Sequence, residues 1–347
     1  MRGPSTTRWL SPSGRRLKTS DVFVLGGRVS VRARASCSQT AWMSHGFTCS
    51  RVAESSYVLI GLLDTVNTMI LVTGATGTIG SQLVPLLDAR GVDYKAMSRD
   101  PQRVRNGVKG DYDDPDSLRH ALDGVDTVFL LTAPGLAAQH DLAVLDAGKD
   151  LRKVVKLSAI GTGDPAAGVT STWHLPGEQA LVESDLKWTV LRPTTFTTNS
   201  LAWLPQIEAD EPIPSLYGDG QSGPVDPRDI AEVAVEALLT DEHDKQTYTL
   251  TGPELLSVPQ QVAILSEVLG KPLRAVAVSR AQARENLLAQ GVPAEGVDSV
   301  LDSFDFMRRG GNAIVTGDME RVLRRSPTTF KQWAQGHEHL KTLAARS

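Results

Sequence analysis

The stretch Met69–Gly80, MILVTGATGTIG, decides the fold of this chain. It opens with apolar, partly β-branched residues, which is typical of a central strand covered on both faces. Gly74, Gly77 and Gly80 follow with the spacing GxxGxxG, one residue different from the dinucleotide-binding pattern GxGxxG. Glycines at these places allow a tight turn, a close approach of backbone to a pyrophosphate, and close packing of helix on strand. The stretch therefore indicates a dinucleotide site.

The residues after the turn have a helical pattern. Ile79, Leu83, Leu86 and Leu87 recur at three- and four-residue spacing. The free N–H groups and the positive dipole end of such a helix suit an anion. Strand, turn and helix thus come in the order that this motif requires, which favours a bound dinucleotide over a purely structural turn.

The length of 347 residues allows two domains or one large domain. The apolar fraction of 41% and the charged fraction of 22% are those of a globular protein, and the net charge of −4 argues against a nucleic-acid partner. Both cysteines, Cys37 and Cys49, precede Met69. We therefore expect no catalytic thiol, disulfide or thiolate metal site in residues 69–347, and no metal in the site.

The first 68 residues differ from the rest, with nine Lys and Arg against three acidic residues and no sustained periodicity. We interpret them as a disordered or spurious extension that precedes a start at Met69. A transit peptide and a functional extension are the alternatives. The apolar run 57–63 is shorter than the roughly 20 residues of a membrane span. We expect a cytoplasmic protein without membrane association.

Strand-like and helix-like segments alternate after Met69. This alternation predicts an α/β fold of the Rossmann type, a doubly wound parallel sheet with helices on both faces, over residues 69–200. Residues 201–347 are expected to form a smaller, mixed substrate lobe, with an irregular lid at 201–223 and some segments returning to the Rossmann sheet. The expected strands of the Rossmann half are 70–72, 93–98, 108–112, 125–131, 154–157 and 188–191.

The end of the second expected strand bears on the choice of cofactor. NAD-specific proteins of this fold carry an acidic residue near this position, whereas this chain has Arg99. A guanidinium suits a 2′-phosphate, which favours NADP(H) over NAD(H), unless Arg99 is a solvated surface charge. Asp111, at the end of the third strand, is placed to accept a hydrogen bond from the adenine amino group.

Ligands of an open parallel sheet lie beyond the carboxyl ends of its strands. Small residues after the fourth strand would let a ribose approach, and the residues after the fifth and sixth strands should line the nicotinamide end. The candidate cofactor residues are Gly74, Thr76, Gly77, Thr78, Ile79, Gly80, Arg99, Asp111, Thr132, Ala133, Pro134, Ser158, Pro193, Thr194 and Phe196.

A proton donor is harder to identify. Short-chain dehydrogenases use Tyr-x-x-x-Lys on the helix between the fifth and sixth strands, but none of the five tyrosines here is followed four residues later by lysine. His174 is the titratable group of this segment whose pKa is naturally near neutrality, which makes it a candidate catalytic acid. The alternative is a pocket or helix-start residue. Glu178 and Glu183 are interpreted as structural or solvated carboxylates.

The order of motifs resembles the NmrA-like group of atypical short-chain dehydrogenases, in the branch of type-two NADPH quinone oxidoreductases and azoreductase-like proteins. The resemblance covers residues 69–347. It implies an NADPH-binding Rossmann domain, a small C-terminal lobe and a substrate cleft between them. The related isoflavone-reductase branch uses a lysine where this chain has His174, Leu175 and Pro176. The motifs are TGATGTIG at 73–80, SRDP at 98–101, GDY at 110–112, LRPTTF at 191–196, VDPRDIA at 225–231 and LTGPE at 250–254.

Two functions follow from these features. The first is an NADPH-dependent reductase of a small quinone-like or aromatic electrophile, because hydride transfer to such a substrate needs mainly proximity and orientation, with protons from water. The alternative is a non-catalytic NADP(H)-sensing regulator with a protein partner, since the group includes such proteins. Sugar-nucleotide epimerisation normally needs the missing Tyr/Lys pair. The sequence predicts no oligomeric state.

Overall fold

The computed structural model describes residues 22–25, 28–31, 68–133, 135–168, 170–289 and 291–344. The chain divides into two units, 1–66 and 67–347. In the first unit, β1 (Val22–Leu25) and β2 (Arg28–Val31) pair antiparallel. The remaining positions up to 67 lie outside the described residues, so the interpretation of 1–68 stays a prediction.

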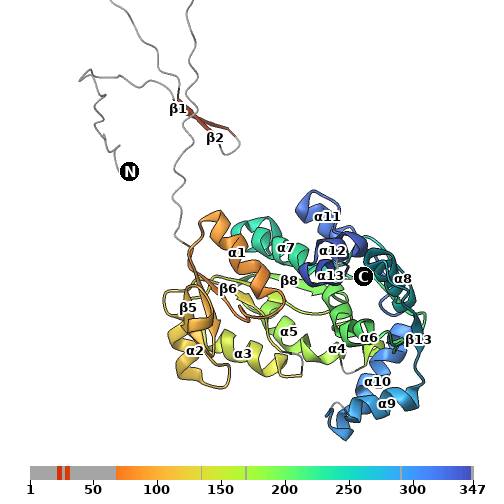
Figure 1. Cartoon of the computed structure of the whole chain (residues 1–347). Helices are drawn as coiled ribbons and strands as arrows, with labels where there is room; N and C mark the ends of the chain where they lie inside the picture. Colours follow the sequence, from red (N-terminus) through yellow and green to blue (C-terminus); the bar gives the residue numbers. More distant parts are fainter. Residues whose placement is uncertain are drawn as a thin grey trace, which may run out of the picture. The chain divides into compact units, whose positions relative to one another are not determined.

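The second unit is built on a seven-stranded sheet in which all neighbouring strands are parallel. Within this unit the chain enters the sheet at the inner strand β3, runs outward to β5 on one side, and then crosses to β6 and runs outward on the other side (Figure 1). The predicted doubly wound Rossmann-type sheet is confirmed. The strands, in spatial order, are β11 (Gln246–Leu250), β8 (Lys187–Pro193), β7 (Lys153–Leu157), β6 (Thr127–Leu130), β3 (Ile70–Val72), β4 (Tyr94–Ser98) and β5 (Gly107–Lys109).

Helices cover both faces of this sheet (Figure 1). One apolar core joins the sheet to α1 (Gly80–Arg90), α7 (Pro227–Leu239) and α11 (Asp318–Leu323). A second core joins the opposite face to α2 (Pro115–Leu122), α3 (Ala137–Ala147) and α5 (Leu175–Glu183). Since both faces are covered, β3, β6 and β7 are buried throughout, which explains the apolar runs ILV in β3, VFL in β6 and VV in β7.

The helix starts follow from short polar signals in the sequence. Asp114 caps α2, where its carboxylate accepts hydrogen bonds from the N–H groups of Asp116 and Ser117. Asp226 caps α7 by accepting from the N–H of Arg228 at 2.9 Å, with Pro227 in the first turn. Both caps follow the common preference for Asp at the N-cap position.

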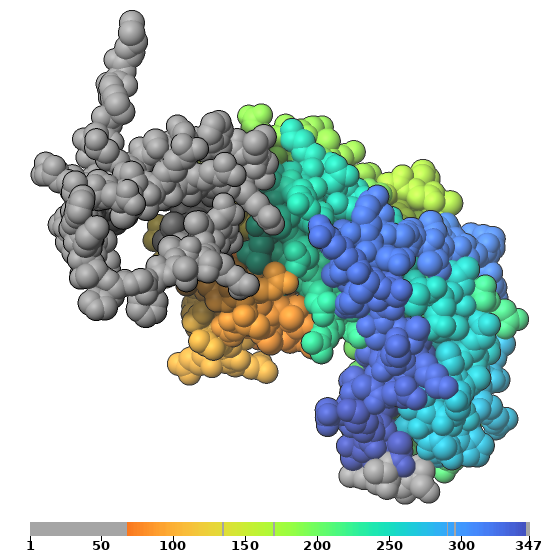
Figure 2. All heavy atoms as spheres, turned by 90° about the horizontal axis from the view of Figure 1, so that it is seen from above, coloured from red at the N-terminus to blue at the C-terminus, as the bar shows by residue number. Residues whose placement is uncertain are grey.

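The C-terminal part of the chain adds a helical lobe with its own core around Leu265, Phe330 and Trp333. In Figure 2 the blue C-terminal segment lies along the cyan segment that precedes it, in agreement with this core. The elements of the lobe are η3 (Thr197–Trp203), α6 (Leu204–Ala209), β9 (Ile213–Ser215), β10 (Gln221–Ser222), β12 (Leu256–Ser257), α8 (Val258–Leu269), β13 (Ala275–Ala277), α9 (Arg280–Ala289), α10 (Ala294–Arg308), α12 (Phe330–Gly336) and α13 (Glu338–Ala344).

One expectation for this lobe was wrong. The segment 201–223, expected to be irregular, contains α6 and β9, because Ile207 and Ile213 are buried in the lobe core. The last helices, α12 and α13, are separated at His337, whose backbone is extended. Within the described ranges, no helix has the length and hydrophobicity that a membrane crossing would need.

Candidate functional site

The glycine turn joins β3 to α1. Gly74 has a φ of 61°, a conformation that favours glycine, and the N–H of Gly77 donates to its carbonyl at 2.9 Å. A Cβ added at Gly80 would lie 2.2 Å from the Gly74 carbonyl oxygen. The first turn of α1 therefore approaches the backbone of the loop more closely than any side chain would permit.

The start of α1, beside this turn, has no side-chain cap. Ile79 occupies the N-cap position and makes no side-chain cap hydrogen bond, and the first turn of α1 carries no acidic residue. Thr76 and Thr78 are exposed, whereas the Ile79 side chain is buried in the core, so only its backbone can face a ligand. A turn without side-chain bulk in front of an uncapped helix start fits the pyrophosphate of a dinucleotide.

A hollow of about 360 Å³ lies beside the turn. It is lined by Thr76 and Ser81 together with the guanidinium-bearing residues Arg103 and Arg105. Arg99, at the end of β4, is exposed and forms no ion pair within the described part of the chain. The sequence analysis missed Arg103 and Arg105, although the run of three arginines after the second strand was a visible signal.

Asp111 lies farther from its strand than expected, because β5 ends at Lys109. One oxygen of its carboxylate accepts a hydrogen bond from the N–H of Asp113 at 3.2 Å, and its own N–H donates to Ser117 Oγ at 2.9 Å. Asp111 is thus tied into the turn before α2. A bond from its carboxylate to an adenine amino group stays a prediction.

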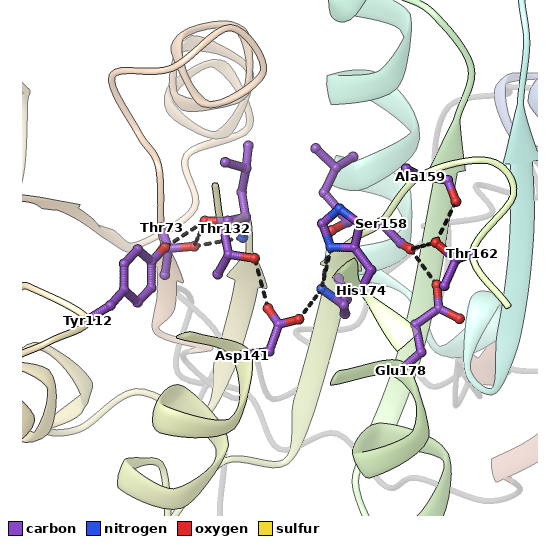
Figure 3. Close-up of polar contacts among 12 residues, drawn as sticks. Thr73, Tyr112, Thr132, Asp141, Ser158, Ala159, Thr162, His174 and Glu178 are labelled. Carbon is purple, nitrogen blue, oxygen red and sulfur yellow. Dashed lines mark hydrogen bonds and ion pairs between the residues drawn. The ribbon is translucent and has the colours of Figure 1, made fainter. Parts of the chain in front are cut away.

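The sheet reverses its winding between β3 and β6, and a polar junction connects the ends of these strands (Figure 3). The N–H of Leu131 donates to Thr73 Oγ1 at 2.8 Å, and the Tyr112 hydroxyl donates to the Leu131 carbonyl at 2.6 Å. Burial raises the pKa of Tyr112 to about 12. Tyr112 is therefore a weak acid that holds the junction, and it does not replace the missing catalytic tyrosine.

A buried polar cluster lies beyond β6 and along β7, formed by Thr132, Asp141, Lys156 and His174. Figure 3 shows Asp141 between Thr132 and His174. Thr132 Oγ1 donates to Asp141 Oδ1 at 3.0 Å, and Lys156 Nζ lies 2.5 Å from Asp141 Oδ2. Lys156 Nζ is also 3.4 Å from His174 Nδ1. The side chains of Asp141 and Lys156 are 0% exposed, so this is an ion pair without access to water.

Burial determines the protonation of the cluster. It raises the pKa of Asp141 and lowers that of Lys156, and in both residues the charge of the partner opposes this effect. Burial, with the Lys156 charge beside it, lowers the pKa of His174 to about 3. His174 is thus a neutral imidazole near pH 7, and an imidazolium acid is not available there.

A second polar group adjoins the cluster at the end of β7 (Figure 3). Ser158 donates to Glu178 and lies 3.2 Å from the Thr162 hydroxyl. Arg192, on β8, binds the Glu178 carboxylate with two nitrogens, one of them at 3.0 Å. Glu178 is buried and structural rather than solvated, whereas Glu183 is exposed.

The other expected nicotinamide residues lie near the same sheet edge. Pro193 is the last residue of β8, two residues beyond the expected end of that strand. Thr194 is buried and donates to the Gly223 carbonyl, while Phe196 pairs with Val225 in a β-bridge. Ala133 is exposed after β6, and the prediction for Pro134 falls outside the described residues.

The site thus brings together Thr132, Ser158 and His174 from the predicted set, and it adds Asp141, Lys156 and Arg192. Lys156 carried a signal, since it is a charged residue within the apolar strand sequence VVKL. Among the described residues, no group of acidic, His or Cys side chains is arranged to hold a metal ion.

Comparison with known proteins agrees with this geometry. Residues 74–241 match the NAD(P)H-binding family. A (4-alkanoyl-5-oxo-2,5-dihydrofuran-3-yl)methyl phosphate reductase of Streptomyces griseus is 36% identical over 277 residues, which are 78% of this chain and 98% of that protein. An NAD(P)H azoreductase of Xenophilus azovorans is 33% identical over 280 residues, 78% and 98% of the two chains.

The fold is also shared with a solved structure. The NADPH complex of an NADPH-dependent quinone oxidoreductase from Escherichia coli superposes with a TM-score of 0.68 at 24% identity, and the match covers 79% of this chain and 99% of that one. At this identity the likeness concerns the fold. The family follows from the sequence relatives, in agreement with the resemblance to NmrA-like reductases: the chain belongs to the NAD(P)H-binding family and is an oxidoreductase.

Proposed function

We propose that the chain uses NADPH to reduce a small quinone-like or aromatic electrophile. The observation that carries the proposal is the polar edge of the sheet, where an uncapped helix start faces the glycine turn and no Tyr/Lys pair stands beside it. A bound nicotinamide would supply the hydride. A conjugated electrophile can accept it without an enzymatic acid, because its reduced form takes protons from water.

The residues that would hold the cofactor divide into two groups. The backbone from Gly74 to Gly80 would bind the pyrophosphate. Thr132, with its hydroxyl already donated to Asp141, and Ser158, donated to Glu178, would shape the nicotinamide end rather than act as acids. Water therefore remains the source of protons in this proposal.

The preference for NADP(H) rests on the guanidinium groups around the hollow beside the turn. Arg99 and Arg103 are exposed and make no ion pair with the described residues, while Arg105 lies 3.5 Å from Asp88. The hollow is lined by Arg103 and Arg105 and by no carboxylate, and Arg99 adds an unpaired guanidinium after β4. This set favours a 2′-phosphate over a free ribose hydroxyl.

The class of substrate is supported by the named activities of the relatives. One of them reduces an azo compound and another an unsaturated, oxygenated ring, as their names state. Both substrates are conjugated electrophiles.

The test is turnover by the full chain with a panel of a simple quinone, an azo dye and a cyclic enone, followed by the loss of reduced nicotinamide absorbance. We expect oxidation of NADPH with at least the quinone, and slower oxidation of NADH. A chain that binds NADPH in calorimetry but reduces no member of the panel would refute the reductase proposal. That result, with unequal affinity for NADP⁺ and NADPH, would favour the sensing alternative.

A further inference from the structure

Lys156 is the feature of the molecule that the proposed function does not use. It lies in the middle of a buried strand, with its side chain 0% exposed, although burying an ammonium group is costly. Its neighbour on β7, Val154, belongs to the apolar core under α2, α3 and α5. Because side chains alternate along a strand, Lys156 points to this same face, where a hydrophobic residue would pack without penalty.

The surroundings of Lys156 are built to hold its charge. Nζ lies 2.5 Å from Asp141 Oδ2, 3.4 Å from the Leu157 carbonyl oxygen and 3.4 Å from His174 Nδ1. Asp141, on α3, is itself oriented by the hydroxyl of Thr132. An ammonium has three N–H groups and no acceptor, and it meets three acceptor atoms here.

The neighbouring helix is shaped around this ion pair. Gly177, in the first turn of α5, is buried, and a Cβ at this position would lie 2.2 Å from Asp141 Oδ2 and 2.8 Å from its Cγ. Only glycine lets the start of α5 approach Asp141 so closely. This approach places His174, the residue before α5, next to Lys156.

The contact with Lys156 fixes the chemistry of the His174 ring. Since an ammonium only donates, Nδ1 of His174 must accept, and the single proton of a neutral imidazole must then lie on Nε2. Nε2 has no hydrogen-bond partner among the residues that the structure describes. It does not belong to the fully buried side-chain atoms that lack such a partner, so it keeps some exposure to solvent although His174 as a whole is only 5% exposed.

We infer that Lys156, held by Asp141, is a positioning residue that fixes His174 as the Nε2–H tautomer, so that His174 presents a neutral N–H donor to the oxygen of the substrate. This role rests on the proposed function, because it places the substrate at the sheet edge beside His174. The donor stabilises negative charge that develops on the oxygen as hydride arrives. It transfers no proton, which therefore still comes from water.

The charged groups around His174 are consistent with a neutral ring. Lys156 on β7 disfavours a second positive charge. The two carboxylates nearby are each engaged elsewhere: Asp141 by Lys156 and Thr132, and Glu178 by Arg192 and Ser158. Neither carboxylate has a hydrogen bond to the His174 ring.

The first measurement is the tautomer of His174 in the full chain, read from the ¹⁵N shifts of histidine-labelled protein and assigned with a His174→Gln variant. We expect Nε2–H in the wild type at pH 7. The Lys156→Met/Asp141→Asn double variant removes both charges and keeps an oxygen for Thr132. We expect a mixture of tautomers in it, and a fall of about tenfold or more in kcat with an unchanged KM for NADPH.

Lys153→Met is the matched control. Lys153 is also a buried lysine of β7, 2.9 Å from Asp244, but it lies at the opposite end of the strand. This variant should lose stability without changing the tautomer of His174 or kcat.

An Nδ1–H tautomer in the wild type would overturn the inference. So would a double variant that keeps both the tautomer and kcat. A wild type that reduces no quinone would instead refute the proposed function, and the tautomer of His174 would still decide the role of Lys156.

Discussion

Removal of the Lys156 charge alone should destabilise the protein strongly. In Lys156→Met, the Asp141 carboxylate keeps its hydrogen bond from Thr132 but loses the ammonium 2.5 Å away, and it has no water to replace it because its side chain is 0% exposed. Breaking a buried pair in this way costs about 3–5 kcal/mol. The retained hydrogen bond offsets about 1 kcal/mol, so we expect a loss of about 3 kcal/mol.

The double variant Lys156→Met/Asp141→Leu separates the cost of the unpaired Asp141 carboxylate from the cost of changed packing at position 156. It leaves no buried charge, and relative to Lys156→Met the Thr132 hydroxyl loses its acceptor, at a cost of about 1 kcal/mol. We therefore expect it to be more stable than Lys156→Met by about 2 kcal/mol. Arg90→Ala is the exposed counterpart, because the Arg90 side chain is 53% exposed in its pair with Glu236, and it should cost less than about 1 kcal/mol.

The assay is urea unfolding of each variant at pH 8 and at pH 5. In Lys156→Met the pKa of Asp141 rises further, since the lowering effect of Lys156 is gone. A carboxyl whose folded pKa lies above its unfolded value loses stability as pH rises between the two values, so the penalty should be smaller at pH 5. A loss below 1 kcal/mol at pH 8, or a double variant less stable than the single, would refute the reasoning.

Three further perturbations test other parts of the site. Arg99→Ala should raise the KM for NADPH about tenfold and leave the KM for NADH within about twofold of the wild-type value. The reason is that a hydrogen bond from an exposed guanidinium to a phosphate is worth about 1.5 kcal/mol. Equal effects on both cofactors would contradict the assignment of Arg99 to the 2′-phosphate. Gly80→Ala places a methyl 2.2 Å from the Gly74 oxygen and should weaken NADPH binding in calorimetry at least about tenfold. Gly296→Ala, where the added methyl has nothing within 4 Å, should leave NADPH binding unchanged. Unaltered binding in Gly80→Ala would contradict the role of the turn. Between pH 7 and pH 5 the wild type should lose about 2 kcal/mol more stability than His174→Asn. The pKa of His174 is about 3 in the folded protein and about 6.5 in the unfolded chain, so the unfolded state takes up the proton first as pH falls. Parallel pH profiles in urea unfolding would show that His174 is not held neutral.

Features that depend on neighbours in the sequence were predicted well. The glycine turn is encoded by three residues within seven positions. The caps Asp114 and Asp226 follow an equally local rule, because each acts on N–H groups two or three residues away. The apolar strand 70–72 was also placed correctly, since burial on both faces leaves a continuous apolar run. In each case a local physical rule determines the structure.

The polar cluster could not be predicted because its members meet only through the fold. Asp141 lies on α3, Lys156 on β7 and His174 before α5, and no spacing rule relates them. Glu178 looked like an ordinary helix carboxylate until β8 brought Arg192 to it. The glycine at position 177 is explained by Asp141, whose carboxylate lies where a Cβ of residue 177 would be.

The central claim is that this chain reduces conjugated electrophiles with NADPH bound at the glycine turn. The most direct measurement is the steady-state rate of the full chain with a simple quinone and either NADPH or NADH, beside Gly80→Ala and Gly296→Ala as a matched pair. We predict turnover with a kcat/KM at least about tenfold higher for NADPH, lost in Gly80→Ala and kept in Gly296→Ala. Turnover that survives in Gly80→Ala, or a wild type that binds NADPH and reduces no quinone, would contradict the account.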